Sequence, residues 1–508
     1  MIREKTMAKE RLTEVNKNSH ENTATSKEKS IAKNSIYYAL YNALNVIFPF
    51  ISGMYVARIL LPDAVGTVAY AQNIAQYFVT FAFLGIPTYG VREIAKVRND
   101  AEARSKIYSE LIVINFISTC VFSLIYLALI LLVPSFRSNL TLYLVTGSAI
   151  ALNALNNSWL YEGLEEFKFI SFRNIAFKAM CLVLLVLFVR RPENYIRYAL
   201  ITVLGTAGNY VINALYAPKF VKFTLHNLHL KRHIESIILL VVVNLAIELY
   251  SLVDVTMLGG LTTSNNVAYY SYASKINKIF VQVINSFTVV IVPRIAFYYK
   301  EGRRKDFDRL LSKTLETIFV IAIPIVAGIQ ICATDAIRLV YGEAFLPSAS
   351  ILRILSFVLI ISPIGYLLGS RVLLVVGREK TMVLCVGSGA IVNIIGNSIL
   401  IPRYVGYGAA IASVFSEIVV MITYLHFGKQ YFNINGQGKH LFKICVATIA
   451  MVGYLLIIDK CVIGESNGII FTRLLIQMIG AIAIYFGLLY IFHEPMVRKY
   501  SKSIIKKF

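Results

Sequence analysis

The sequence is poor in charged residues. Only 15% of its 508 residues are Asp, Glu, Lys or Arg, while 57% are hydrophobic and the mean hydropathy is +0.66. Soluble domains contain roughly 25% charged residues. A chain with so few polar groups cannot cover a water-facing surface, so its surroundings must be largely lipid. This composition excludes soluble enzymes, fibrous proteins and disordered proteins.

The sequence also lacks the motifs of metal and nucleotide sites. Its six cysteines are scattered singly, so neither a disulfide framework nor a zinc cluster is indicated. No glycine-rich phosphate loop ends in Lys-Ser or Lys-Thr, and no HExxH motif occurs. His226, His229 and His233 have helical spacing, but a solvated linker is favoured over a metal site. We therefore expect no cofactor, no metal and no catalytic residues.

Long apolar segments fill most of the chain. A helix that spans a membrane uses about 20 apolar residues. Lipid offers no partner to backbone groups, so each segment must be helical. The sequence predicts an all-α integral membrane protein with about 14 transmembrane helices, at residues 34–60, 67–91, 107–133, 139–161, 170–190, 195–217, 233–258, 267–293, 313–333, 349–375, 381–401, 406–427, 441–460 and 469–493.

Basic residues are distributed unevenly between the connections. Of the 50 Lys and Arg residues, 36 lie in one alternating set of connections and eight in the other. Because cytoplasmic loops are enriched in Lys and Arg, both termini are expected in the cytoplasm. The net charge of +22 then reflects these loops and not nucleic acid binding. We predict a multi-pass protein of the cell membrane that begins with a flexible tail at 1–33.

Two parts of the sequence resemble each other. Val68-Ala69-Tyr70 is echoed by Val267-Ala268-Tyr269, and a basic connection follows each copy. The repeat predicts two six-helix halves around a central cavity, which rock against each other during transport. The expected parts are the tail 1–33, an N-terminal bundle 34–217, a cytoplasmic linker 218–232, a C-terminal bundle 233–427, and two additional helices with a basic tail at 428–508.

Several ionisable residues lie deep within the predicted spans. Each costs roughly 2.5–3.5 kcal/mol at the centre of a membrane helix unless it is wetted or paired. Lys275 and Lys278 are three residues apart, so we expect them to share one helix face as an anion site, for example for a diphosphate. The alternative is that Asp254 or Glu248 merely neutralises them. The other deep residues are Lys178, Glu248 and Glu417.

The carboxylates among these residues suggest ion coupling. Asp254, Glu248 and Glu417 are candidates for binding a proton or a sodium ion. Arg58 either pairs with Asp254 at the outer end of the cavity or extends toward the membrane surface. The sequence leaves these two roles of Arg58 equally open.

Amide side chains gather on predicted helix faces. The pattern involves Asn42 and Asn45 in the first span, Gln72, Asn73 and Gln76 in the second, and Asn153, Asn156 and Asn157 in the fourth. These amides either hydrogen-bond neighbouring helices or line the cavity and bind sugar. For any single residue the helix-to-helix role is slightly favoured.

Several local motifs are similar to those of a known family. The segment RILLPDAVG at 58–66, the turn Gly85-Ile86-Pro87 and the turn Ile401-Pro402-Arg403-Tyr404 resemble polysaccharide flippases of the Wzx type. That family belongs to the multidrug/oligosaccharidyl-lipid/polysaccharide exporter superfamily. The resemblance covers essentially all of the chain after residue 30.

The resemblance implies a transport function. Such flippases move undecaprenyl-diphosphate-linked oligosaccharides across the cytoplasmic membrane, and a polysaccharide polymerase and other assembly proteins are expected partners. Relatives that flip the peptidoglycan precursor place arginines on spans one, two and eight, whereas the deep cations on span eight here are lysines. The alternatives are a cation-coupled multidrug exporter and a membrane glycan polymerase. The polymerase is disfavoured because all the predicted outer loops are short.

Overall fold

The chain is helical throughout the part that is described. The computed structural model describes residues 45, 47–289, 291–431, 437–495 and 497–498, and no strand occurs among them. The first helices are a run at Ile47–Lys96 that ends in α2 (Ile86–Lys96), then α3 (Ala101–Leu132), α4 (Pro134–Arg137), α5 (Leu140–Leu152), α6 (Ser158–Gly163), α7 (Phe167–Phe188), α8 (Tyr195–Val203) and α9 (Asn209–Tyr216). The later helices are α10 (Lys231–Leu261), α11 (Ser264–Val289), α12 (Val292–Lys300), α13 (Arg304–Tyr341), α14 (Pro347–Ser356), α15 (Val358–Tyr366), α16 (Glu379–Gly428), α17 (Gly438–Cys461) and α18 (Asn467–Ile491).

These helices account for the apolar segments of the sequence. Within the described ranges, nine helices are long and apolar enough to cross a membrane, and the bent pair formed by α14 and 358–373 would be a tenth. The runs Ile47–Lys96 and α16 are each about twice the length of one span, and a residue with positive φ interrupts each of them, Leu61 and Val405 respectively. The all-α membrane architecture is confirmed, whereas the total of 14 spans stays a prediction.

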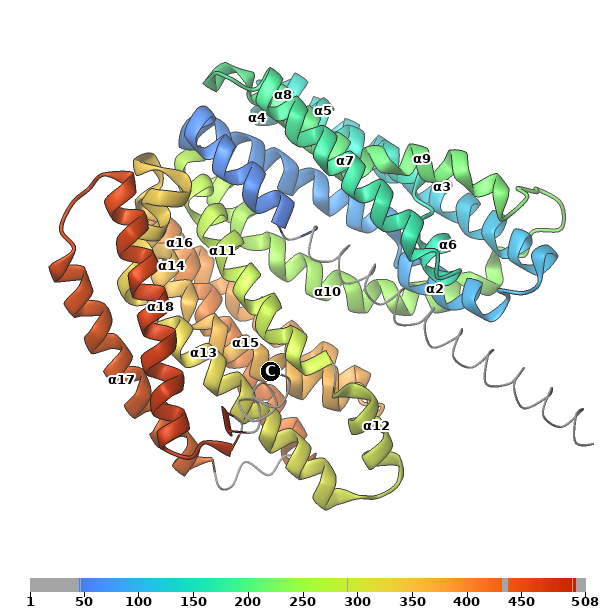
Figure 1. Ribbon diagram of the computed structural model, residues 1–508. Helices are drawn as coiled ribbons and strands as arrows, with labels where there is room; N and C mark the ends of the chain where they lie inside the picture. The colour runs from blue at the N-terminus through green and yellow to red at the C-terminus, as the bar shows by residue number, and fades with distance from the viewer. Residues whose placement is uncertain (1–44, 46, 290, 432–436, 496, 499–508) are drawn as a thin grey trace, which may run out of the picture.

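The helices form two neighbouring groups. In Figure 1 the blue-to-green helices and the yellow-to-red helices lie side by side, with α10 and α11 between them. The connection after α9 contains no α-helix from 220 to 230. The boundaries at 217 and 233 stay a prediction, and the expected tail at 1–33 lies outside the described residues.

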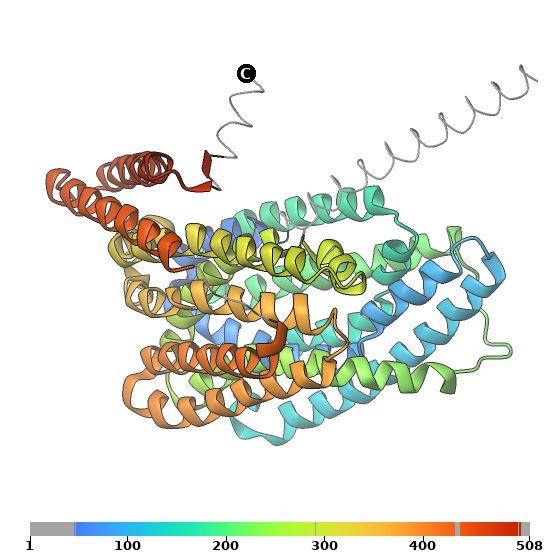
Figure 2. The same ribbon diagram turned by 90° about the horizontal axis from the view of Figure 1, so that it is seen from below.

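The last two helices form a hairpin on the outside of the second group. Both α17 and α18 pack against α13 and against each other. Both views show the turn between them at the opposite end of the molecule from the connection of α2 to α3 (Figures 1 and 2). Buried side chains such as Ile444, Met451 and Tyr485 fill the contact with Val320 of α13.

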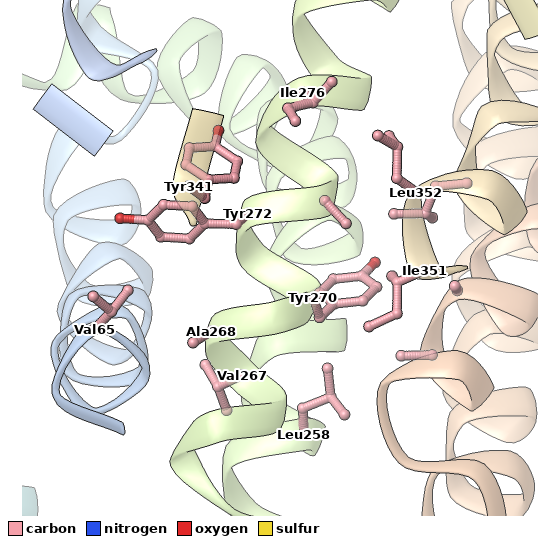
Figure 3. Close-up of a cluster of buried hydrophobic side chains, with 14 of the residues drawn as sticks. Val65, Leu258, Val267, Ala268, Tyr270, Tyr272, Ile276, Tyr341, Ile351 and Leu352 are labelled. Atoms are coloured by element: carbon pink, nitrogen blue, oxygen red, sulfur yellow. The ribbon is translucent and has the colours of Figure 1, made fainter. Parts of the chain in front are cut away.

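Helix α11 lies at the centre of the apolar core and uses two of its sides. Figure 3 shows Tyr272 beside Tyr341 on one side of the helix, with Val65 beyond them, and Tyr270 with Ile351 and Leu352 on the other. The ring of Tyr272 packs edge-to-face on Tyr341 with 4.5 Å between ring centroids. Tyr270 and Tyr272 are two residues apart and differ by about 200° around the helix, so they point to opposite sides of it. The hydroxyl of Tyr272 also donates to the carbonyl oxygen of Gly53 in the first half at 3.4 Å.

The two halves meet tightly where the first helical run approaches the turn between α10 and α11. A Cβ atom added to Gly66 would lie 1.7 Å from the carbonyl oxygen of Ser264, so only glycine fits there. One residue further on, the hydroxyl of Thr67 lies 3.1 Å from that of Ser264. Asn73 adds a link by donating to the carbonyl oxygen of Leu252 at 3.1 Å. This end of the interface between the halves is closed.

Candidate functional site

Two polar cavities lie on different sides of α11. The first, here called the N-half cavity, has a volume of about 550 Å³ and is lined mostly by residues before 218, together with Lys275. The second, the C-half cavity, has a volume of about 860 Å³ and is lined by residues between 251 and 417, including Lys278. The expected single face with both lysines is therefore divided. Lys275 lines one cavity and Lys278 lines the other.

The N-half cavity is rich in positive charge. Its lining includes Lys178 and Arg173 of α7 and Lys275 of α11, with Glu162 as the carboxylate in the wall. The formal charges of these four side chains sum to +2. The Nζ of Lys275 lies 4.5 Å from the centroid of the Tyr272 ring, which holds the ammonium group by a cation–π contact. The cavity therefore favours an anion.

Lys178 is positioned by the first helical run. Its Nζ donates to the side-chain oxygen of Asn45, which also accepts from Asn174 at 3.1 Å. The side chain of Lys178 also packs over the Phe48 ring at 5.7 Å, and the residue is only 8% exposed. Asn45 lines this cavity. It contributes there by orienting a cation.

The C-half cavity contains a buried carboxylate surrounded by neutral donors. Asp254 of α10 is 7% exposed. It accepts hydrogen bonds from four side chains on two other helices: Tyr270 of α11, and Asn393 at 3.0 Å, Asn397 at 2.7 Å and Ser413 at 2.7 Å, all three on α16. Either end of an amide can face a neighbour after a half-turn, so both asparagines can also present oxygen. The arrangement can hold a proton or a small cation.

The predicted amides separate into two groups. Gln72 and Asn45 line the N-half cavity. The side-chain amide of Asn73 instead donates to Leu252 and, at 2.7 Å, to Thr256 of α10. Gln76 is exposed and donates to Thr80 at 3.4 Å. Neither Asn73 nor Gln76 is a lining residue of these two cavities.

The amides of the fourth span join helices. Asn153 donates to Asn115 and Thr119 of α3, both at 3.3 Å, and Asn157 donates to the Tyr108 hydroxyl at 3.1 Å. Neither is a lining residue of the two cavities, whereas Asn156 lines the N-half cavity. Asn42 lies outside the described residues. The helix-to-helix role thus describes Asn153 and Asn157.

Arg58 and the two glutamates occupy different positions from one another. Arg58 is exposed and donates to the carbonyl oxygen of Leu339 at the end of α13, so it is not the partner of Asp254. Glu417 lines the C-half cavity together with Asp254. Glu248 is half-buried on α10 and is not a lining residue of either cavity.

Comparison with protein families identifies this architecture. Residues 31–298 match the family model described as "Polysaccharide biosynthesis protein", and residues 165–471 match that of "Lipid II flippase MurJ". Each match covers more than half of the chain. The chain belongs to the polysaccharide biosynthesis protein family. It is a multi-pass membrane protein of the Wzx-type flippase class in the multidrug/oligosaccharidyl-lipid/polysaccharide exporter superfamily.

Individual relatives align with most of this chain. It is 22% identical to a putative O-antigen transporter of Escherichia coli over 405 residues, which are 78% of this chain and 96% of the relative. It is 23% identical to the capsular polysaccharide biosynthesis protein CapF of Staphylococcus aureus over 417 residues, 79% of this chain and 100% of the relative. These relatives are a transporter and a biosynthesis protein by name.

Solved structures show the same fold. The lipid II flippase MurJ in an inward closed conformation superposes with a TM-score of 0.69 at 18% identity, over 91% of this chain and all of that chain. A multidrug resistance transporter in an inward-facing conformation superposes with a TM-score of 0.60 at 15% identity, over 78% of this chain and 97% of that chain. The flippase family and the drug exporters therefore share this helical framework.

Sequence reasoning missed several residues of this flippase-family site. Arg173, which no sequence pattern singled out, is 6% exposed and lines the N-half cavity. Lys178 was recognised as deep but was not placed in the site. Asn393 and Asn397, four residues apart on α16, carried a usable signal, because two amides on one face of an apolar helix are costly unless they have a partner.

One linker histidine was misjudged. His233 was expected in a solvated linker, but it is buried and its ring lies 2.8 Å from both the Tyr89 hydroxyl and a Glu110 carboxylate oxygen. Glu110 also accepts from Arg232. This buried network attaches the start of α10 to α2 and α3.

Proposed function

We propose that the protein is a flippase for undecaprenyl-diphosphate-linked oligosaccharide repeat units, acting in the synthesis of capsule, O-antigen or a similar surface polysaccharide. The charge of the N-half cavity carries this proposal. Lys178, Lys275 and Arg173 line a cavity of about 550 Å³ inside a membrane protein, and their cost in the membrane is offset when an anion binds between them. A diphosphate has the charge and the number of oxygen acceptors that such a group of donors requires.

Other side chains of the N-half cavity suit the sugar part of the substrate. Amides and hydroxyls such as Gln72, Asn209 and Thr206 can hydrogen-bond a glycan, and the polyprenyl chain stays in lipid. Two residues of this lining have a buried polar atom without a hydrogen-bond partner among the described residues, Gln72 Nε2 and Asn209 Oδ1, which can donate to and accept from a sugar hydroxyl respectively. Outward rocking of one half against the other then releases the headgroup.

We further propose that Asp254 binds the coupling ion, a proton or a sodium ion. Its neighbours all carry oxygen, which is the ligand atom that hard cations prefer. An ion at this site and an anion in the N-half cavity would both influence the position of α11, because Tyr270 and Lys275 both belong to that helix. Glu417 is a second candidate, since it lines the same cavity.

We propose that the protein lies in the cytoplasmic membrane with both termini in the cytoplasm, because the distribution of Lys and Arg favours this orientation. Its expected partners are the lipid-linked glycan, the polysaccharide polymerase and other assembly proteins. A multidrug exporter would use a carboxylate-rich cavity for organic cations, whereas the cations of the N-half cavity repel them. Drug sensitivity of a deletion strain with normal surface polysaccharide would favour that alternative.

The decisive experiment is the double variant Lys178→Ala/Lys275→Ala in a deletion strain of the source organism. Each charge-assisted hydrogen bond contributes about 1.5–3 kcal/mol, so surface polysaccharide should fall by about 100-fold while the lipid-linked glycan accumulates. Lys168→Ala is the matched control, because Lys168 lies exposed on the same helix. Full export by the double variant at normal membrane levels would refute the diphosphate site.

A further inference from the structure

Side chains from three elements converge at one end of the α17–α18 hairpin. His440 lies in the first turn of α17, Glu494 follows the end of α18, and Glu316 belongs to α13. Within the described part of the chain, these three residues form the group of His, Cys, Asp or Glu side chains whose ligand atoms all lie within 4.8 Å of one another. The hairpin thus meets the transport bundle at a cluster of potential metal ligands.

The imidazole of His440 lies between the two carboxylates of this cluster. His440 Nδ1 lies 2.8 Å from Glu494 Oε1, and His440 Nε2 lies 3.8 Å from Glu316 Oε1. The side chain of Glu494 is completely buried, and those of Glu316 and His440 are 12% and 25% exposed. The second carboxylate oxygen of Glu494, Oε2, has no hydrogen-bond partner among the described residues.

The two carboxylates of the cluster lie near a lysine. The Nζ of Lys443 lies 3.7 Å from Glu494 Oε2. A buried carboxylate without full compensation is strongly unfavourable. Lys443 follows His440 by one helical turn and is 32% exposed, so it can turn toward solvent when another cation enters.

At the opposite end of the same hairpin, the charged side chains have direct partners. There Arg473 of α18 pairs with Asp335 of α13, with Nε donating to Asp335 Oδ2 at 2.6 Å. Its Nη1 also donates to the carbonyl oxygen of Val462 at 3.0 Å. One end of the hairpin is therefore attached to α13 by a satisfied ion pair, whereas the other end presents an imidazole and two carboxylates with an unsatisfied oxygen.

We propose that Glu316, His440 and Glu494 bind a divalent transition-metal ion, with Zn²⁺ the best match, and that the ion attaches the hairpin to α13. One imidazole nitrogen and two carboxylate oxygens are ligands that Zn²⁺ commonly takes, at about 2.0–2.2 Å. Binding of one ion requires His440 to turn so that one ring nitrogen faces a common centre with both carboxylates. Three protein ligands leave the fourth position for water, so the site is open to exchange with solvent.

The test measures Zn²⁺ binding to the full-length protein in detergent, purified through a tag that contains no histidine. Calorimetry and metal analysis should find one Zn²⁺ per chain at pH 7.5, and Zn²⁺ should raise the melting temperature. Glu494→Gln and His440→Ala should each weaken binding by about 100-fold. The control His226→Ala/His229→Ala alters two exposed histidines of the linker and should bind normally.

Three results would overturn the proposal. They are an absence of Zn²⁺ binding by the wild-type protein, equal binding by wild type and Glu494→Gln, and loss of binding in the linker control. Glu316→Gln provides a second test if the Glu494 variant does not fold. Because binding is measured without transport, its outcome is independent of the proposed flippase function.

Discussion

The two cavities on either side of α11 differ in how their charges are arranged. In the N-half cavity three cations face one carboxylate, and two of the cations come from α7. In the C-half cavity Lys278 and Arg371 are matched by Asp254 and Glu417, and Asp254 is held by four neutral donors. The lining of the first cavity has a net positive formal charge, which favours an anion, whereas the charges of the second cavity balance. One helix therefore serves two chemically distinct spaces.

Removing each lysine of α11 separately is the most direct test of the difference between the two cavities. Lys275→Ala should reduce export of the surface polysaccharide by about tenfold or more, because the diphosphate loses one charge-assisted contact. Lys278→Ala should reduce it only about two- to threefold, since Lys278 faces the balanced cavity. Export is measured as polymer on intact cells at matched membrane levels.

The charge-conserving variants complete this test. Lys275→Arg should restore most of the activity, because a guanidinium group also binds phosphate oxygens. Equal losses for Lys275→Ala and Lys278→Ala would mean that the two cavities act as one space, as the helical spacing first suggested.

The role of Asp254 is the next difference to probe. Asp254→Asn keeps the shape of the side chain but removes the charge that attracts a cation. Export should fall by about tenfold, and the remaining activity should no longer depend on the coupling ion. The initial rate is compared in the presence and absence of sodium, and with and without a proton uncoupler.

Ser413→Ala is the control for Asp254, because it removes one of the hydrogen bonds that Asp254 accepts and leaves the carboxylate in place. It should retain ion dependence. If Asp254→Asn exports at the wild-type rate with unchanged ion dependence, the C-half cavity does not hold the coupling site.

The smallest effect separates a structural amide from a cavity amide. Asn73→Ala removes two hydrogen bonds to α10, and such bonds between membrane helices contribute about 0.6 kcal/mol on average. Its melting temperature in detergent should drop by a few degrees. Gln72→Ala should leave the melting temperature unchanged and lower export about threefold, because Gln72 lines the N-half cavity. The reverse pattern would exchange their roles.

Neighbouring amides show why the site was only partly predictable. Gln72 and Asn73 have the same chemistry and adjacent positions, yet one side chain reaches a cavity and the other reaches Leu252, almost 180 residues away. Lys275 and Lys278 differ by about 60° around the helix, which is enough to place them in separate cavities. Spacing along one helix does not reveal which neighbours surround it.

The sequence alone determined that this protein lies in lipid, because its composition is so apolar. It also determined the helical class, because backbone groups in lipid need internal hydrogen bonds, and it showed deep charges that require compensation. The family resemblance was also readable from local motifs. Only the tertiary structure decided which cations share a cavity, which amides join helices, and that Asp254 binds side chains of α16. Those relations depend on how distant helices pack, and packing brings together residues that no local pattern connects.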